Sequence, residues 1–450
     1  MQIPVLLVLP QSNANMAVSM AVDQGGGFPE GFAPDPDFPM MMIGDTTTSD
    51  QSMVAMLGDG VGIAGEPLMA VRGWVEGSLD DPPTQMGGFT VFSDPEIDTC
   101  LTCIGTPPVG SWLDVAALVD VGALAIHGMD GSNVAIGIVD TGINLDHLTG
   151  VLGWTPNLDS TNSWTPPGAI ATPGNWPVHH GTMCAFDALI AAPNATLVDI
   201  PVLSARLPGG GSTMSATLSA ALLAYSGVLA SWNSGTGSGD LSQYAGLILS
   251  NSWGIFHPSW DFPVGHPGRY CDNPNHPFML QLEAMSRGGI DMFFAAGNCG
   301  ADCPDGRCQN RTTDAVMGAS ASIDVMSIAG CDINDDRVGY SSQGPSIPGI
   351  PPGTKPDITS YTHFDGSQAF GAGSPDSGTS AACPVAAGCM AALRTKISPR
   401  GAATTYMMYD HLRLNAAVKV PFAPGWNADY GHGIIRPVAV ADLFFAPGTV

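Results

Sequence analysis

The run from Ser377 to Gly388 (Ser-Gly-Thr-Ser-Ala-Ala-Cys-Pro-Val-Ala-Ala-Gly) places one hydroxyl, that of Ser380, where a turn passes into a helix. Gly378 permits a tight backbone approach, the alanines that follow are strong helix formers, and Pro384 is expected in the first helical turn. A hydroxyl at a helix N-terminus lies near unpaired N–H groups, which favour the negative charge that acyl transfer to a serine develops. Taken alone, such a serine is more often an N-cap than a nucleophile.

Two further stretches contain the groups that would activate Ser380. A serine is a weak nucleophile until a histidine accepts its proton, and a carboxylate usually orients that histidine. The apolar run from Asn133 to Val139 predicts a buried parallel strand, and Asp140 follows it at the carboxyl end, where α/β sheets carry their sites. His180 opens an apolar helix that is expected to reach Ala192. Each residue alone has an ordinary structural role, so only the combination indicates catalysis.

This combination resembles one family. Three sequence motifs are similar to the active-site signatures of the subtilisin-like serine proteases, the subtilases: Val-Asp-Thr-Gly at Asp140, His-Gly-Thr-Met-Cys-Ala at His180 and Gly-Thr-Ser-Ala-Ala-Cys-Pro at Ser380. They stand in the order Asp, His, Ser, which is the subtilisin order and differs from those of chymotrypsin and the α/β-hydrolases. The resemblance covers roughly residues 110–443. It implies that Asp140, His180 and Ser380 form a catalytic triad.

The resemblance also implies residues that hold the substrate. Phe293 to Asn298 looks like the oxyanion-hole strand of the family, in which Asn298 would donate its side-chain amide beside the Ser380 N–H. Asn251 to Gly254 looks like the segment that lines the primary specificity pocket and pairs with the substrate backbone. The glycine-rich turn 209–212 would form one side of the groove; phosphate binding there is disfavoured because no Walker lysine accompanies it. The implied substrate-binding residues are Gly210, Gly211, Ser212, Ser252, Trp253, Gly254, Ala295, Ala296 and Gly297.

Length and composition agree with one large enzyme domain and a smaller N-terminal part. The chain has 450 residues, enough for an α/β domain of about 330 residues and a leading region of about 100. The 57 glycines and 38 prolines indicate long ordered loops. We predict a three-layer α/β/α subtilisin-like domain with a mainly parallel central sheet over residues 110–445, preceded by a smaller N-terminal region over residues 1–109.

The N-terminal region is expected to be propeptide-like or accessory, and partly irregular. Residues 1–10, 68–76 and 88–92 predict strands, whereas residues 23–50 and 80–87 are rich in turn-forming types. In many subtilases a propeptide precedes the catalytic domain, assists its folding and inhibits it. The position of this region makes it a candidate for such an element, although it carries no propeptide motif. In that case the enzyme would cut itself between about residues 80 and 111.

Ten cysteines leave the redox compartment open. Cys184 and Cys383, which lie within the motifs around His180 and Ser380, are expected to be small buried packing residues. Cys100 and Cys103 form a Cys-x-x-Cys without the βαβ context of a redox motif. The remaining cysteines near the predicted pocket suggest disulfides, with free thiols or a zinc site of non-standard spacing as alternatives: Cys271, Cys299, Cys303 and Cys308.

No metal or cofactor is assigned. The insertion-like loop 255–277 holds several candidate ligands, but their irregular spacing favours ordinary surface polarity over a metal site: His257, Asp261, His266, Asp272 and His276. Structural calcium is left open, because its sites are not readable from this sequence.

The formal net charge of −26 reflects scarce Lys and Arg, 14 in all, more than abundant acid. That balance disfavours nucleic-acid binding, and no apolar run approaches the roughly 18 residues of a membrane span. The expected partner is therefore a protein or peptide substrate, with the oligomeric state open. Residues 1–10 are apolar but follow no basic segment, so they indicate a strand rather than a signal peptide. The compartment stays open, with an intracellular location favoured over secretion.

We predict a serine endopeptidase that hydrolyses peptide bonds through an acyl-enzyme, with an Asp/His/Ser triad and an asparagine oxyanion hole. Two alternatives use the same fold. A catalytically silent subtilase used for binding is disfavoured, because all four catalytic positions are filled. A serine esterase or acyltransferase would share the triad chemistry, although no Gly-x-Ser-x-Gly elbow supports a hydrolase of that kind. Hydrolysis of a peptide compared with a simple ester separates these functions.

Overall fold

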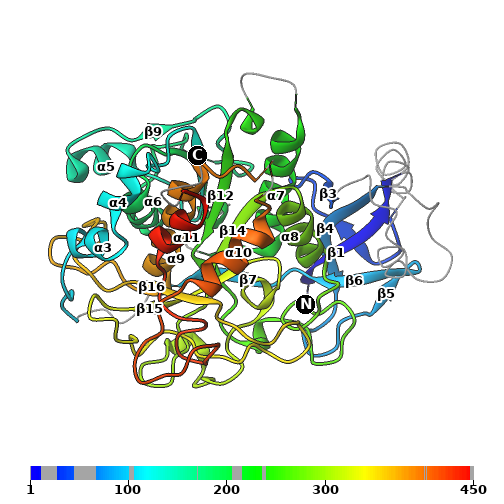
Figure 1. Ribbon diagram of the computed structural model, residues 1–450. Helices are drawn as coiled ribbons and strands as arrows, with labels where there is room; N and C mark the ends of the chain where they lie inside the picture. The colour runs from blue at the N-terminus through cyan, green and yellow to red at the C-terminus, as the bar shows by residue number, and fades with distance from the viewer. Residues whose placement is uncertain are drawn as a thin grey trace.

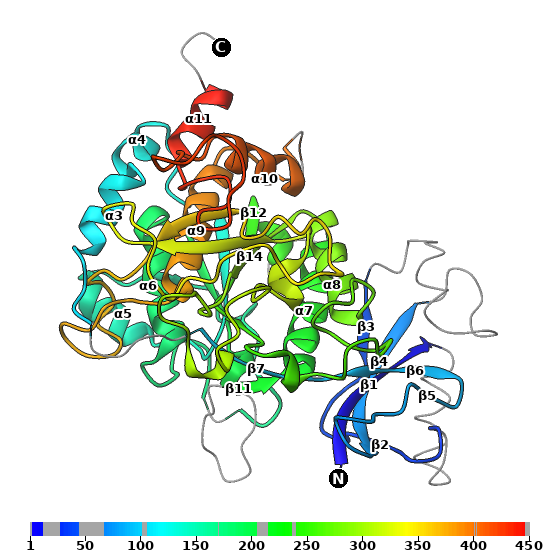
Figure 2. The same ribbon diagram turned by 90° about the horizontal axis from the view of Figure 1, so that it is seen from below.

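The computed structural model describes residues 2–11, 28–44, 67–100, 106–169, 171–204, 215–235, 240–399, 401 and 403–445. A large three-layer domain packs against a smaller sheet that the N-terminal region forms, and the two lie side by side in Figures 1 and 2. Among the described residues, no helix combines the length and the apolar character that crossing a membrane requires.

A seven-stranded sheet in which every pairing is parallel forms the centre of the large domain. Five of its strands are buried along their whole length, as expected for apolar runs in a parallel sheet that is covered on both faces. In spatial order, the strands are β16 (Ile358–Tyr361), β15 (Met326–Cys331), β14 (Ile290–Ala295), β12 (Gly246–Asn251), β8 (Val134–Val139), β10 (Thr196–Ile200) and β9 (Asn157–Leu158). The sequence predicts buried strands over residues 133–139, 196–203 and 247–250, and all three are confirmed, with shifts of one to three residues at their ends.

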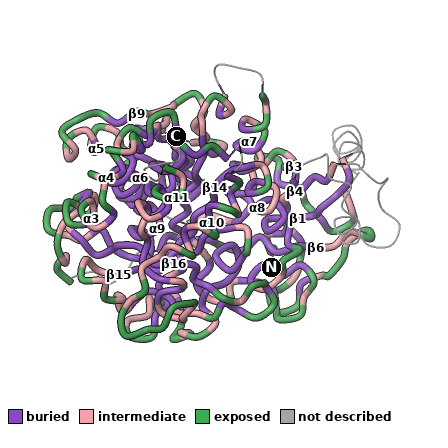
Figure 3. Tube along the Cα trace, in the orientation of Figure 1, coloured by how far each residue is buried: buried purple, intermediate pink, exposed green. Residues whose placement is uncertain are grey.

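Helices cover both faces of this sheet, which gives the predicted three layers (Figure 1). Because strand side chains alternate, Val134, Ile136 and Ile138 of β8 face the core that contains α6 and α9, while Ala135 and Val139 face the core that contains α7 and α8. Buried chain is concentrated around the central strands and α9 (Figure 3). The helices are α3 (Trp112–Leu118), α4 (Val121–Ile126), α5 (Leu145–Leu152), α6 (His180–Ala191), α7 (Leu218–Asn233), α8 (Pro277–Arg287), α9 (Thr379–Arg394), α10 (Thr405–Leu414) and α11 (Pro437–Phe445).

Two helices differ from the sequence-based expectation. The sequence of residues 115–126 predicts a single helix, but the backbone turns at Asp120, whose φ of 55° interrupts it and whose carboxylate caps α4. The residues after the glycine-rich turn predict a helix over residues 213–232, but the helix begins at Leu218, because residues 215–217 pair as the strand β11 (Ser215–Thr217). The start of this helix differs from the prediction because pairing with a distant strand outweighs the local helix propensity of residues 215–217.

The N-terminal region forms a six-stranded sheet in which every pairing is antiparallel, and the three strands predicted there are confirmed. Its two faces enter different cores. Leu6 and Val8 join the core that contains α7 and α8, whereas Val5 and Leu7 form a separate cluster with Phe262, which the large domain supplies. The strands are β1 (Gln2–Pro10), β2 (Phe32–Pro34), β3 (Met41–Ile43), β4 (Leu68–Glu76), β5 (Gln85–Met86) and β6 (Phe89–Ser93).

Polar contacts fasten this sheet to the start of α7 and α8. Asp94, which follows β6, accepts hydrogen bonds from the Ser219 N–H (2.7 Å) and hydroxyl (2.8 Å), and Arg72 of β4 lies 3.1 Å from its carboxylate. The buried His276 caps α8 through Nδ1 and donates from Nε2 to the Ser93 carbonyl at 3.0 Å. Burial lowers the pKa of His276 to about 3, which keeps this imidazole neutral. The N-terminal sheet is therefore packed and hydrogen-bonded onto the large domain.

Candidate active site

Asp140 and His180 lie in direct contact. Asp140 follows β8 and His180 is the first residue of α6; both side chains are buried. His180 Nδ1 lies 2.8 and 2.9 Å from the two Asp140 carboxylate oxygens. This contact directs the Nδ1 proton to the carboxylate and leaves Nε2 as the proton acceptor. Gly181 is required by the close approach of α6, because a Cβ there would lie 2.6 Å from the Gly142 carbonyl oxygen.

Ser380 is the second residue of α9, after Gly378 at a φ of 82°. Pro384 lies in the second turn rather than in the first, which corrects the sequence-based expectation. Because proline has no N–H, the Ser380 carbonyl loses its helical partner. That carbonyl accepts instead from the Ser252 hydroxyl at 3.0 Å and the Cys184 thiol at 3.5 Å. Pro384 thus frees the backbone of Ser380 to be held by the β12 and α6 segments.

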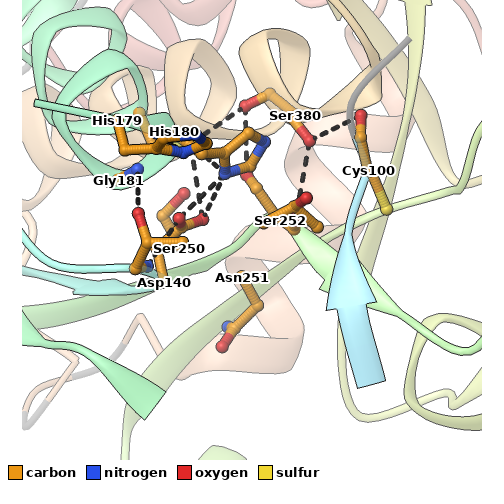
Figure 4. A network of polar contacts seen from close by, with 12 residues as sticks. Cys100, Asp140, His179, His180, Gly181, Ser250, Asn251, Ser252 and Ser380 are labelled. Atoms are coloured by element: carbon orange, nitrogen blue, oxygen red, sulfur yellow. Dashed lines mark hydrogen bonds and ion pairs between the residues drawn. The ribbon is translucent and has the colours of Figure 1, made fainter. Parts of the chain in front are cut away.

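Asn298 is oriented by the residue before Ser380. Its side-chain carbonyl accepts from the Thr379 N–H at 2.9 Å and from the Thr379 hydroxyl at 3.0 Å. This leaves the amide end of the side chain to donate to the carbonyl oxygen of Cys100. The Ser380 hydroxyl donates to that same oxygen at 2.9 Å and to the Ser252 carbonyl at 3.3 Å. Figure 4 shows the hydroxyl directed toward Cys100 and Ser252.

The strand β7 (Glu96–Thr99) brings Cys100 to this point. It follows the N-terminal sheet in the chain and pairs antiparallel with β11 (Figure 2) on one side and with β13 (Trp253–Gly254) on the other. The Cys100 N–H donates to the Ser252 carbonyl at 3.1 Å. In the described part of the chain, His180 Nε2 has no hydrogen-bond partner. β7 and Cys100 therefore lie as an extended peptide in the cleft between β11 and β13, and the Cys100 carbonyl accepts from both the Asn298 amide and the Ser380 hydroxyl.

Cys100 borders a pocket of small and apolar residues. Trp253, Gly254, Ala295, Ala296 and Gly297 line it, together with deeper residues that the sequence did not indicate: Ile255, Phe256, Cys299, Ala315, Met317 and Ser320. No charged residue is among those that line this pocket in the described chain. Five of the predicted substrate-binding residues thus gather around Cys100.

The other predicted substrate-binding positions have different outcomes. Ser252 contributes its backbone carbonyl to the Cys100 N–H. Gly210, Gly211 and Ser212 lie outside the described residues, although the adjacent β11 forms one side of the cleft. Sequence reasoning missed the strand over residues 96–99. Its signal was the alternation of Ile97 and Thr99, which are buried, with polar neighbours just ahead of the catalytic domain.

The structure shows which of the candidate metal ligands lie close together and which of the cysteines are disulfide-bonded. Among the described residues, one group of potential ligands gathers closely, namely Asp140, His180 and Cys184. Burial raises the pKa of the Cys184 thiol well above its ordinary value, which disfavours the thiolate that a metal would need. The ligands in loop 255–277 do not gather in this way. Cys299 and Cys308 form a disulfide and Cys303 is also disulfide-bonded, whereas Cys271 is a buried free thiol.

Buried carboxyl groups lie next to the elements that carry Asp140, His180 and Ser380. Asp187 of α6 lies near Asp376, which precedes the Ser380 turn, and both are buried. Burial raises the pKa of both groups, that of Asp376 to about 6, and each influences the other. Asp199 accepts from the Ile143 and Gly174 N–H groups (3.2 and 2.9 Å) and so holds the loop after Asp140.

A parallel α/β/α domain with an aspartate–histidine pair at the sheet edge and a serine at the start of a buried helix defines a serine protease of the subtilisin class. Residues 131–433 match the model of the subtilase family, Peptidase_S8. The chain therefore belongs to the subtilase family of serine proteases, and the expected family and fold are confirmed. It is also similar to a solved lanthipeptide protease, with 18% identity, 74% of this chain and 95% of that chain covered, and a TM-score of 0.49.

Proposed function

We propose that this protein is a serine endopeptidase in which Ser380 is the nucleophile, His180 the general base, Asp140 the group that orients His180, and Asn298 an oxyanion donor. The placement of the Cys100 carbonyl carries the proposal. That group lies 2.9 Å from the Ser380 hydroxyl and accepts from the Asn298 amide, in a peptide that pairs with the enzyme on both sides. Recognition of the backbone on two edges favours a peptide over a simple ester, which lacks the N–H groups that such pairing uses.

The mechanism follows from these positions. The Ser380 hydroxyl rotates from the substrate carbonyl to the unpartnered His180 Nε2 and gives up its proton as its oxygen attacks the carbonyl carbon. The oxyanion accepts a hydrogen bond from the Asn298 amide, which the contacts with Thr379 have already oriented. His180 then protonates the leaving amine, so that an acyl-enzyme remains. Water, activated by the same imidazole, releases the acyl group and restores the Ser380 hydroxyl.

The same placement supports a role for the N-terminal region as a cis-acting inhibitor that occupies the cleft until it is cut. The proposed cut lies between Cys100 and Leu101, within the interval of residues 80–111 expected from the sequence. Packing of its sheet on α7 and α8, through Asp94 and His276, supports a segment that holds its last strand in the cleft.

Intact mass and covalent labelling test the proposal. Wild-type protein should lose the first 100 residues, whereas Ser380→Ala stays full length. A fluorophosphonate should label Ser380 of the processed enzyme alone, and His180→Ala should lose nearly as much peptidase activity as Ser380→Ala because triad members act as a unit. The control His179→Ala should matter far less. Label on another serine would refute the nucleophile assignment; equal full-length masses with full wild-type activity would make the N-terminal region a permanent part of the enzyme.

A further inference from the structure

The loop closed by the Cys299–Cys308 disulfide lies directly beside the proposed oxyanion donor. Cys299 follows Asn298 in the chain, and the Asp305 N–H donates to the Asn298 carbonyl at 2.8 Å. The Cys308 N–H returns to the Asp305 carbonyl at 3.0 Å, which closes a short turn at the end of the loop. The loop is therefore tied to the active site at both of its ends and holds its side chains in place relative to the cleft.

Arg307 of this loop reaches the strand in the cleft. Its Nη1 donates to the Asp98 carboxylate at 2.5 Å, and among the described Lys and Arg residues it is the one that forms an ion pair with β7. Contacts within the large domain hold the rest of its guanidinium. Nε and Nη2 donate to Asp305 at 3.0 and 2.8 Å, and Cζ lies 3.8 Å from the centre of the Phe256 ring. The guanidinium is thus positioned without help from β7, and Nη1 faces the cleft.

The strand register places Asp98 two residues before Cys100, whose carbonyl faces Ser380. Asp98 pairs with Gly254 on one side and Ser215 on the other, so its backbone occupies the position of a bound substrate. We propose that Arg307 is a specificity-determining residue that selects an acidic side chain at the third position on the amino side of the scissile bond. This inference rests on the proposed endopeptidase function. The substrate class is therefore peptides with Asp or Glu two residues before the residue whose carbonyl is attacked.

The preference for an acidic side chain opposite Arg307 should be moderate in size. Both side chains of the pair are about three-quarters buried, with 26% and 20% of Arg307 and Asp98 exposed. A charge-assisted hydrogen bond from a preorganised guanidinium exceeds an ordinary surface pair, which is worth at most about 1 kcal/mol. The protein as a whole carries a net charge of −26, which repels acidic peptides at long range. We expect about a tenfold preference in kcat/KM for Asp over Asn at this position.

The test uses active enzyme prepared from the full chain and three matched peptides. The reference peptide, Glu-Ile-Asp-Thr-Ala-Leu-Thr, copies residues 96–102 with alanine in place of cysteine, so that no substrate thiol exchanges with the disulfide. The other two replace Asp by Asn or by Lys. Wild type should cleave the Ala–Leu bond of the Asp peptide about tenfold more efficiently than that of the Asn peptide, with the Lys peptide poorest. Arg307→Lys should keep part of the preference, Arg307→Ala should abolish it, and Arg307→Glu should favour the Lys peptide.

Controls separate specificity from structural damage. Arg311→Ala, just beyond the loop, should behave as wild type. Arg307→Ala should still take the fluorophosphonate on Ser380, and its cleavage of the Asn peptide should fall far less than its cleavage of the Asp peptide, because a merely structural role would lower the cleavage of every peptide alike. Equal cleavage of the Asp and Asn peptides by wild type, or an unchanged preference in Arg307→Ala, would overturn the inference. Failure of wild type to take the label or to cleave any of the peptides would instead count against the proposed endopeptidase.

A charge exchange within the chain provides a second readout. In the intact protein, Asp98→Lys should slow self-cleavage after Cys100, and combining Asp98→Lys with Arg307→Glu should restore most of the rate in an intact-mass time course. Slow processing in both proteins would contradict a direct interaction between the two side chains.

Discussion

Asp199 should make this protein less stable as the pH rises toward neutrality. Its carboxyl is buried on β10, and burial raises its pKa from an ordinary 3.8 to about 7, more than its two backbone hydrogen bonds lower it. A carboxyl with a higher pKa in the folded than in the unfolded state contributes stability that is complete below the unfolded pKa and is lost as the pH rises through the folded pKa. The change in the pKa of Asp199 from 3.8 to about 7 corresponds to roughly 4 kcal/mol.

Urea unfolding of the Ser380→Ala protein between pH 4 and pH 8 measures this effect without self-digestion. Asp199→Asn in the same background keeps the shape and one acceptor but does not titrate. The free energy of unfolding of the carboxyl protein minus that of the amide protein should fall by roughly 4 kcal/mol across this range. A difference for Asp199 that stays constant within about 0.5 kcal/mol would refute the reasoning.

Three further predictions concern the cleft and the docked sheet. Asn298→Ala should lower kcat by about 10² to 10³ with little change in KM, the usual cost of one oxyanion donor; the exposed Asn310→Ala is the control in the same kinetic assay, and an unchanged kcat would remove Asn298 from that role. Leucine in place of alanine in the reference peptide should raise kcat/KM, because the residues that line the pocket beside Cys100 in the described chain are mostly apolar and none is charged, whereas arginine should lower it; the reverse order would contradict the pocket assignment. In the Ser380→Ala protein, Phe262→Ala should lower the free energy of unfolding by about 3 to 5 kcal/mol because Phe262 is 1% exposed, whereas Val264→Ala, at 82% exposed, should change it by less than about 0.5 kcal/mol.

Short-range patterns predicted most of the fold. The apolar runs of β8, β12 and β14 indicated covered parallel strands, and those of β1 and β4 were found with almost the same bounds. Burial on one or both faces imposes such patterns locally, so they can be read without knowing the partners. Predictions failed where distant pairing overrode local preference, as in β11, where residues 215–217 pair with β7 instead of opening the helix.

The same distinction between local patterns and distant contacts applies to the candidate site. Short sequence motifs predicted the candidate site residues, because the chemistry requires particular residue types at strand and helix ends: Asp140, His180, Ser380 and Asn298. The structure brings Asp140 into hydrogen-bond contact with His180 and directs the Asn298 amide into the cleft. No sequence pattern indicated that Pro384 would release the Ser380 carbonyl to Ser252, since that contact joins residues 128 positions apart.

The sequence by itself determined the family, the order of the catalytic groups and the strands that carry them, because each depends on residue types within a few positions of one another. Only the tertiary structure decided what lies in the cleft. The short strand over residues 96–99 has little local signal, and its place depends on β11, β13 and Arg307, which lie more than 100 residues further along the chain. Contacts between such distant segments form only after the chain has folded, so the pairing of Asp98 with Arg307 and the position of the Cys100 carbonyl could be recognised only in three dimensions.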